Sequence, residues 1–348
     1  MFQDISLEEL HALRNRHELT VIDVRSESEF ADSTIPGSVN IPLFTDEERA
    51  EVGTLYKQTS IQAAKQRGLE IVSAKLPAFI RQFGEIKGKK AVFCWRGGMR
   101  SRTTATVLSL MDIHAYRLVG GFRTYRKWVI ETLENCEMPQ EAYVLHGHTG
   151  TGKTALLKKL SEAGQAVLDL EELAGHRGSI FGEAGLKPRN QKTFEALLLE
   201  ELLRLKDQPF FFFEAESKRI GRVVLPEFLV KKKLEGTPVQ LVLPLEARIQ
   251  QILHDYEPAV YKEHYIKAFH QVKRRIHTPV AAEIESSLLE DQFENAIRLL
   301  LIHYYDPRYT YSEEQYETQS KEVRIEAPSV EEAFVQIMDK LNLKQGTA

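Results

Sequence analysis

The stretch AYVLHGHTGTGKTALLKKL, residues 142–160, decides the fold of the second half of the chain. Residues 142–146 have the short apolar pattern of a buried β-strand, and residues 154–160 have the pattern of an α-helix. Between them, residues 147–154 match G-x4-G-K-[ST], a pattern that binds phosphate at a strand-to-helix junction. The stretch therefore predicts a phosphate-binding loop (P-loop) within a parallel α/β domain.

Each group of this loop has an expected role. The backbone N–H groups of residues 150–153 are expected to surround a pyrophosphate, Lys153 adds a positive charge, and the Thr154 hydroxyl commonly holds Mg²⁺. The sequence contains no N-K-x-D element for reading guanine, so the loop predicts a polyphosphate ligand and does not specify ATP. The predicted diphosphate-binding residues are Gly147, Gly150, Gly152, Lys153 and Thr154.

The rest of the second half agrees with this interpretation. Residues 209–213 (PFFFF) and 239–243 (VQLVL) are short apolar runs bounded by turn residues, which is typical of buried parallel strands. Residues 193–205 and 291–305 have helical periodicity. We therefore expect a P-loop NTPase-like α/β domain with a parallel sheet and a helical C-terminal region.

Acidic side chains follow the run at 209–213. Glu214 and Glu216 occupy the place where an acidic partner of the P-loop is expected, at the end of a neighbouring strand. Asp169, after a shorter strand-like segment, is a weaker candidate. No metal site is certain from the sequence; if Mg²⁺ binds, we expect Thr154 and Glu214 to hold it.

The first half of the chain predicts a second α/β domain. Residues 19–24 (LTVIDV), 91–95 (AVFCW) and 116–119 have strand patterns, and residues 45–84 are largely helical. The pattern loosens after Trp128, through ENCEMPQEA. We therefore predict one domain over residues 1–134 and a P-loop domain over residues 135–348.

Cys94 lies at the end of a predicted strand and is followed by WRGGMRSR, before a helix expected to begin near Thr103. A loop that enters a helix N-terminus directs backbone N–H groups inward and adds the positive end of the helix dipole. These groups and the arginines favour the nucleophilic thiolate and would hold an anion. Cys136 lacks such surroundings and is expected to be a bystander. The predicted anion-binding residues of the loop are Arg96, Gly97, Gly98 and Arg100.

The segments VIDVRSESEF, IPGSVNIPL, FCWRGGMRSR and VGGF resemble the rhodanese fold, in that order. The resemblance implies that Asp23 and Arg25 support the site and that Cys94 carries a persulfide or its selenium equivalent. The C-x5-R spacing from Cys94 to Arg100 is one residue longer than the usual sulfurtransferase loop and also resembles rhodanese-fold phosphatases. Trp95 and Met99 fit the small interior of a phosphatase loop less well. The loop alone leaves both chemistries open.

The two modules together resemble the bacterial tRNA 2-selenouridine synthase family over almost the whole chain. The segments that carry this resemblance are FCWRGGMRS, GGFRTYR, GHTGTGKT, AGHRGSIFG and FEAESKRIGRVVLP. His176 and Arg177, in the fourth segment, form a polar turn with Gly178 that is expected to face the phosphate site.

The resemblance implies a transferase that acts on 2-thiouridine at the wobble position of tRNA. The sulfur is first alkylated by geranyl diphosphate, and the resulting S-geranyl-2-thiouridine is converted to 2-selenouridine with selenium from selenophosphate. Cys94 would carry an S-selanylcysteine intermediate, the P-loop would bind diphosphate, and no tightly bound cofactor is implied. A selenophosphate-supplying enzyme is an implied partner. Helical periodicity does not distinguish a pocket for the geranyl chain from ordinary core.

Basic residues that alternate with aromatic ones predict a surface for the tRNA anticodon region, because aromatic rings stack unpaired bases and cations hold phosphates. Tyr256, Tyr261, Tyr265 and Phe269 are interleaved with the basic residues of 262–275, although core packing explains them equally well. The candidate tRNA-binding residues are Arg123, Arg126, Arg219, Arg222, Arg274 and Arg275.

Composition limits the alternatives. The 348 residues carry a net charge of −4 and only two cysteines, and no apolar run is long enough to cross a bilayer. We therefore expect a cytoplasmic chain without disulfides and without a membrane partner. Two other functions remain open: a rhodanese-fold sulfurtransferase or C-x5-R phosphatase fused to an ATP-using P-loop module, and a P-loop switch that regulates a persulfide-sensing binding module.

Overall fold

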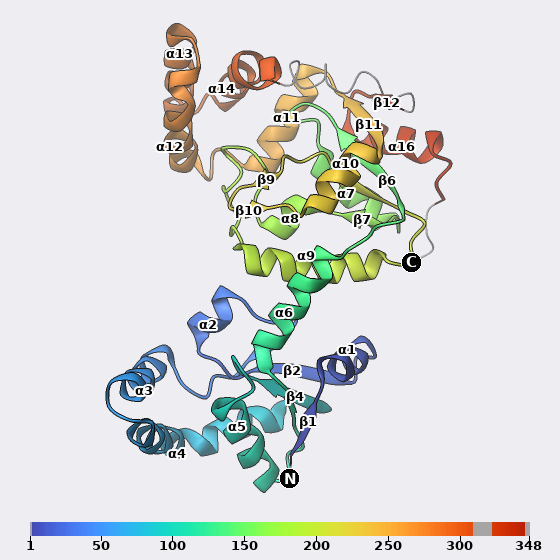
Figure 1. Ribbon diagram of the computed structural model, residues 1–348. Coiled ribbons are helices and arrows are strands. Elements are labelled where there is room, and N and C mark those ends of the chain that lie inside the picture. The colour runs from blue at the N-terminus through green and yellow to red at the C-terminus, as the bar shows by residue number, and fades with distance from the viewer. Residues whose placement is uncertain (1, 309–321, 345–348) are drawn as a thin grey trace. The chain divides into compact units, whose positions relative to one another are not determined.

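The computed structural model describes residues 2–308 and 322–344. The chain divides into two compact units, with the boundary between Asn135 and Cys136. Both units are α/β and each contains a parallel sheet, which confirms the predicted fold class (Figure 1). None of the helices in these described ranges is long and apolar enough to cross a membrane.

The first unit is built on a five-stranded sheet with the order β1-β5-β4-β2-β3. Apolar side chains of α4 and α5 pack against β2 and β4 on one face of this sheet, around Ile22, Phe83 and Val92. The strands are β1 (Gln3–Ile5), β2 (Leu19–Asp23), β3 (Val39–Asn40), β4 (Lys89–Phe93) and β5 (Tyr116–Leu118). The helices are α1 (Leu7–Asn15), α2 (Glu27–Asp32), α3 (Asp46–Gln58), α4 (Ile61–Glu85), α5 (Met99–Leu110) and α6 (Gly121–Glu134).

The second unit has a parallel sheet with the order β12-β11-β6-β8-β7, in which β6, the strand before the P-loop, is central. The strands are β6 (Glu141–His146), β7 (Val167–Leu168), β8 (Phe210–Glu214), β11 (Thr237–Val242) and β12 (Val323–Glu326), and β9 (Arg219–Ile220) and β10 (Val223–Val224) form a separate hairpin. The helices around the sheet are α7 (Lys153–Glu162), α8 (Leu170–Ala174), α9 (Gln191–Leu205), α10 (Glu227–Glu235), α11 (Leu245–Tyr256) and α16 (Val330–Lys340).

A helical layer lies at the margin of the second unit (Figure 1, orange). It has its own apolar core, which includes Phe269, Ile284 and Leu300. Its elements are α12 (Lys262–Val272), a short 3-10 helix (Lys273–Arg275), α13 (Thr278–Leu289), α14 (Phe293–Leu300) and a π-helical turn (Leu301–Tyr305).

Two predicted helices differ from the structure at their ends. Helix α5 begins at Met99, directly after its N-cap residue Gly98, and not near Thr103. Arg100 therefore lies in the first helical turn and not in an irregular loop. The helix predicted over residues 291–305 changes to π-helical geometry at Leu301, a change that apolar periodicity does not reveal.

Candidate active sites

The backbone between β4 and α5 holds Cys94 in place. The Cys94 side chain is buried, and its Sγ atom lies 3.2 Å from the Ser101 Oγ atom in the first turns of α5. The start of α6 closes over this loop: the Phe122 N–H donates to the Cys94 carbonyl oxygen and the Arg123 N–H donates to that of Trp95, both at 2.9 Å. The sulfur is thus fixed beside a hydroxyl group at a helix N-terminus, which favours a negative charge on it.

Gly121 makes this close approach possible. Its φ of +60° lies in the left-handed region, and a Cβ atom there would overlap the Cys94 carbonyl oxygen and the Gly97 nitrogen. The GGF segment, identified only through the resemblance, therefore has a physical role: it allows α6 to begin directly against the Cys94 loop.

The arginines of the loop differ in their surroundings. The Arg100 guanidinium is paired with Glu29, and Arg96 is exposed. Arg117, which the sequence analysis missed, donates to the Gly97 carbonyl oxygen at 3.2 Å and pairs with Asp4. The hydrogen bond with Asp4 raises the pKa of Arg117, and negative charge on Cys94 acts in the same direction.

Asp23 and Arg25 form a buried ion pair beside this loop, with 2.6 Å between Nη2 and Oδ2. The Arg25 guanidinium lies 4.3 Å from the centre of the Phe122 ring and donates to the Ser33 carbonyl oxygen. Thr34 donates to the Asp23 carboxylate. The pair therefore packs the segment after β2 against the start of α6, which is a supporting position.

Trp95 and Met99 are not packed in the protein interior: they are 39% and 61% exposed. The loop geometry is compatible with an anion or with a chalcogen atom on Cys94.

We predict that Ser101→Ala slows alkylation of Cys94 by iodoacetamide at neutral pH about tenfold, because a hydrogen bond to a charged group contributes about 1.5–3 kcal/mol. The rate would be measured in a Cys136→Ser background. Thr106→Ala is the matched control, since the exposed Thr106 hydroxyl on the same helix donates only to the Arg102 carbonyl oxygen. Equal rates in the Ser101 and Thr106 variants would show that the hydroxyl does not activate the sulfur.

The P-loop lies between β6 and α7, as predicted. The Lys153 ammonium donates to the Gly147 carbonyl oxygen at 2.9 Å, which folds the side chain back over the loop. The Thr154 hydroxyl donates to Glu171 at 2.8 Å. Glu171 was not among the predicted residues.

Arg248 braces the loop from α11. Its buried guanidinium donates to the Thr149 carbonyl oxygen at 2.9 Å and pairs with Asp306 at 2.6 Å. Gly152 has a φ of +71°, and a Cβ atom there would overlap the Val330 side chain. The loop is therefore held in shape by residues far from it in the sequence.

Three carboxylates meet beside the loop. Glu171, Glu214 and Glu216 offer oxygen atoms that all lie within 4.8 Å of one another. Burial and the charge of Glu216 raise the pKa of Glu171 to about 8. Burial and the charge of Glu171 raise the pKa of Glu214 well above its usual range. Asp169, the weaker candidate, instead caps α8, where its carboxylate accepts from the Glu172 N–H.

The P-loop lines a cavity of about 430 Å³. Glu171 and Glu216 form part of its wall, and Arg177, Gly178 and Lys233 add to it, whereas the fully buried Glu214 does not line it. His176 is not part of the lining. It is buried, and its ring packs so closely against Gly221 that a Cβ atom added to Gly221 would overlap the ring. Lys233, on α10, was not predicted as part of this site. Desolvation lowers its pKa.

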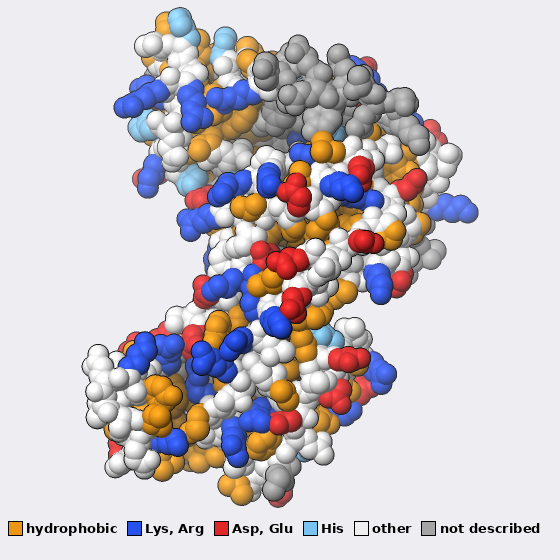
Figure 2. Space-filling view, viewed as in Figure 1, with side chains coloured by type: hydrophobic (Ala, Val, Ile, Leu, Met, Phe, Trp, Pro, Cys, Tyr) orange, Lys and Arg blue, Asp and Glu red, His pale blue; other side chains and the backbone are white. Residues whose placement is uncertain are grey.

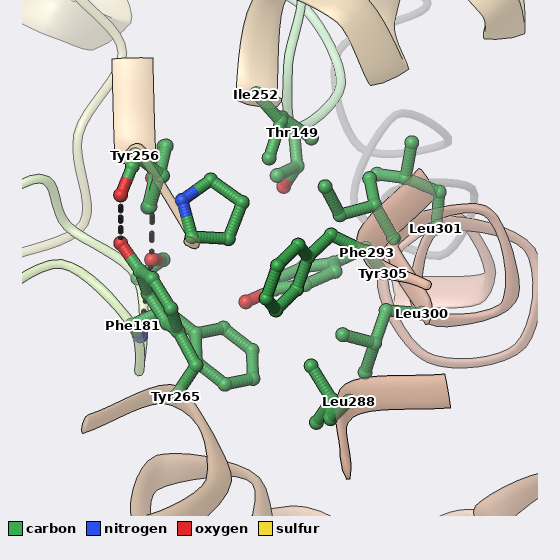
Figure 3. Close-up of a pocket in the computed structure, with 13 residues that line it drawn as sticks. Thr149, Phe181, Ile252, Tyr256, Tyr265, Leu288, Phe293, Leu300, Leu301 and Tyr305 are labelled. Carbon is green, nitrogen blue, oxygen red and sulfur yellow. Dashed lines mark hydrogen bonds between the residues drawn. The ribbon is translucent and has the colours of Figure 1, made fainter. Parts of the chain in front are cut away.

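A second, apolar pocket adjoins this cavity (Figure 3). It lies between the P-loop, α11 and the helical layer, and its volume is about 60 Å³. The two spaces share wall residues, which are Thr149, Ser179, Ile252, Tyr256 and Tyr305.

The candidate tRNA-binding arginines are placed on several elements. Arg123 and Arg126 lie on α6, Arg219 on β9, Arg222 in the turn before β10, and Arg274 and Arg275 in the 3-10 helix after α12. On the face shown in Figure 2, Lys and Arg side chains are interspersed with Asp and Glu over the second unit.

The aromatic residues near these arginines belong to the protein interior. Tyr265 and Phe269 are buried in the core of the helical layer, and Tyr256 lines both pockets. The suggestion that Tyr265 and Phe269 stack RNA bases is therefore wrong.

Comparison with known proteins covers both units. Residues 6–128 match the family model of rhodanese-like domains, and residues 140–288 match that of the tRNA 2-selenouridine synthase AAA domain. The tRNA 2-selenouridine synthase of Sulfurovum sp. is 34% identical over 85% of this chain and 89% of its own length, and that of Photobacterium profundum is 30% identical over 84% and 88%. A human single-domain sulfurtransferase is 25% identical, with a TM-score of 0.23, over 38% of this chain and 98% of its own.

Proposed function

The chain belongs to the tRNA 2-selenouridine synthase family, and from this premise we propose that it converts wobble-position 2-thiouridine of tRNA to 2-selenouridine through an S-geranyl intermediate. Its substrates would be geranyl diphosphate and selenophosphate, and it would act in the cytoplasm with a selenophosphate-supplying enzyme as a partner. The observation that carries this proposal is a buried, hydrogen-bonded Cys94 in the same chain as a cavity lined by the P-loop.

In the first step, the 2-thio sulfur attacks C1 of geranyl diphosphate, and the C–O bond to diphosphate breaks. The leaving group gains negative charge as this bond breaks. Lys153 and the P-loop N–H groups would stabilise that charge, and Lys233 and Arg177 also line the cavity. No nucleotide hydrolysis is needed, because the P-loop only has to bind and release diphosphate.

The selenium of selenophosphate is at the selenide level, so loading it onto Cys94 as S-selanylcysteine needs a two-electron oxidant; an external disulfide would supply it, and phosphate would be released. In the second step, this selenium attacks C2 of the base, and the C2–S bond breaks as geranyl thiol leaves. Alkylation makes this possible because a geranyl thiol leaves far more readily than a thiocarbonyl sulfur. An external thiol then cleaves the Se–S bond to Cys94, which releases 2-selenouridine and leaves a disulfide. The Ser101 hydroxyl lies beside the cysteine sulfur and would stabilise negative charge on it.

We also propose that a divalent cation such as Mg²⁺ binds between the diphosphate and the carboxylates. The residues fit this role: Oε2 of the fully buried Glu214 has no hydrogen-bond partner among the described residues, and it lies in the three-carboxylate group. Thr154, Glu171, Glu214 and Glu216 would hold the ion, which supplies charge neutralisation for the departing diphosphate.

Cation binding is expected to strengthen with pH. Below pH 8, Glu171 carries a proton that the cation must displace, because its pKa is raised to about 8. The pKa of Glu214 is also raised, so the proton on its carboxyl group adds to the dependence. The apparent affinity for Mn²⁺, measured calorimetrically, is therefore expected to rise by about tenfold or more per pH unit between pH 6 and pH 7. Glu171→Gln should reduce this slope. An affinity that is constant from pH 6 to pH 8 in the wild-type protein would contradict the prediction.

Mass spectrometry of nucleosides tests the proposed function directly. Transfer RNA that carries 2-thiouridine is incubated with the protein and geranyl diphosphate, and then with selenophosphate. We expect a geranyl adduct that is converted to 2-selenouridine. Unchanged RNA, with both enzyme and substrate intact, would favour the sulfurtransferase or phosphatase alternative.

A further inference from the structure

The apolar pocket beside the P-loop continues the phosphate cavity into the helical layer. Thr149 of the P-loop contributes to both spaces, as do Ile252 and Tyr256 of α11. A ligand with its phosphate groups on the P-loop therefore has an apolar space directly next to it. The pocket itself is small, about 60 Å³, and it adjoins the larger cavity of about 430 Å³, so it suits a narrow apolar group that extends from that cavity.

The pocket offers little to a polar ligand. Away from the shared residues, its walls are formed by side chains of the helical layer together with Phe181 and Pro258. The Tyr265 hydroxyl donates to the Tyr256 carbonyl oxygen at 2.5 Å, so it is already engaged. The helical-layer residues that line the pocket are Tyr265, Leu288, Phe293, Ile297, Leu300 and Leu301.

The wall farthest from the P-loop comes from α13 and α14. In Figure 3, Leu288 lies on the side of the pocket opposite Thr149 and Ile252, and Leu300 lies beside it. Leu288 is only 5% exposed, so this side is closed by the core of the helical layer. A chain that enters from the P-loop would therefore end against Leu288.

We infer that this pocket binds the isoprenoid chain of an allylic diphosphate and that Leu288 limits the length of that chain to about ten carbons. The inference rests on the proposed function and deepens it, since it names the residues that hold and select the donor. The diphosphate lies on the P-loop, the chain passes Ile252 and Tyr256, and its end contacts Leu288 and Leu300.

Burial of the chain predicts a large difference in affinity. Each buried methylene group contributes about fourfold in affinity, so three or four such groups buried in the pocket are expected to make binding about 100-fold tighter than that of pyrophosphate alone. Leu288→Trp would fill the far end and remove most of this gain. Leu288→Ala would lengthen the pocket and shift the preference from geranyl towards farnesyl chains.

The test is calorimetric titration of the full chain, without RNA, with pyrophosphate and with the S-thiolodiphosphate analogues of dimethylallyl, geranyl and farnesyl. We expect Leu288→Trp to lose at least tenfold in affinity for the geranyl analogue while its affinity for pyrophosphate and the dimethylallyl analogue is retained. Leu289→Trp is the matched control, because the adjacent Leu289 is 58% exposed and does not line the pocket. Retained pyrophosphate binding shows that each variant is folded.

The outcomes separate this inference from the proposed function. A geranyl analogue that binds the wild-type protein no more tightly than pyrophosphate overturns the pocket assignment, whatever happens to RNA. Equal affinities in folded Leu288→Trp, Leu288→Ala and Leu289→Trp variants overturn the role of Leu288. Tight, Leu288-dependent binding without any geranylated RNA would leave the pocket assigned and the proposed function contradicted.

Discussion

Cys94→Ala is expected to lower the rate of selenation at least about 1,000-fold, because removal of a nucleophile that acts covalently typically costs this much. Geranylation is expected to continue at nearly the wild-type rate, since the proposed first step uses only the P-loop. S-geranyl-2-thiouridine should therefore accumulate when the variant receives both geranyl diphosphate and selenophosphate. Mass spectrometry of the nucleosides would measure both products in one sample.

The control for this variant is Cys136→Ala, which removes the other, half-buried cysteine of the chain. It should convert the RNA at the wild-type rate. A Cys94→Ala protein that still converts geranylated RNA to 2-selenouridine would contradict the assignment of the selenation step to the rhodanese-like unit.

The converse result is expected from Lys153→Ala. Without the ammonium group, the departing diphosphate loses one charge-assisted contact in a partly enclosed cavity, and removal of such a group typically costs about 100–1,000-fold in kcat. Selenation of RNA that was geranylated beforehand should remain. The measurement is single-turnover formation of geranylated RNA, followed separately by conversion of synthetic geranylated RNA.

Lys158→Ala is the matched control, because this exposed lysine lies on the same helix and faces away from the cavity lining. If Lys153→Ala and Lys158→Ala geranylate RNA at equal rates, the P-loop does not act on the diphosphate. Opposite defects in the Cys94 and Lys153 variants would establish that each unit performs one step.

The sequence predicted those site residues that lie next to one another along the chain. The P-loop was identifiable because strand, glycines, lysine and threonine are contiguous, and the Cys94 loop was identifiable for the same reason. Glu171 was missed because its contact with Thr154 depends on how β7 and α8 return the chain to the loop. Arg117 and Arg248 were missed because each supports its loop from a distant element.

The aromatic residues of α12 show a second limit of prediction from sequence. Tyr265, Phe269 and Val272 are spaced as one face of a helix, which is the signal of a core position, and all three are buried. Nearby lysines and arginines made an RNA-binding interpretation equally plausible from sequence. Only the packing of α12 against α13 and α14 distinguishes a core position from an RNA-binding one. The apolar pocket was unpredictable for the same reason, since its lining and the adjoining core have the same composition.

The π-helical turn Leu301–Tyr305 lies between the apolar pocket and a residue that supports the P-loop. Leu301 and Tyr305 line the apolar pocket, and the next residue, Asp306, holds Arg248 against the P-loop. If the inferred donor occupies both spaces, binding of its hydrocarbon chain and binding of its diphosphate would be thermodynamically coupled, equally in both directions. A nucleotide, which has phosphates but no hydrocarbon chain, would lack this coupling and would bind less tightly.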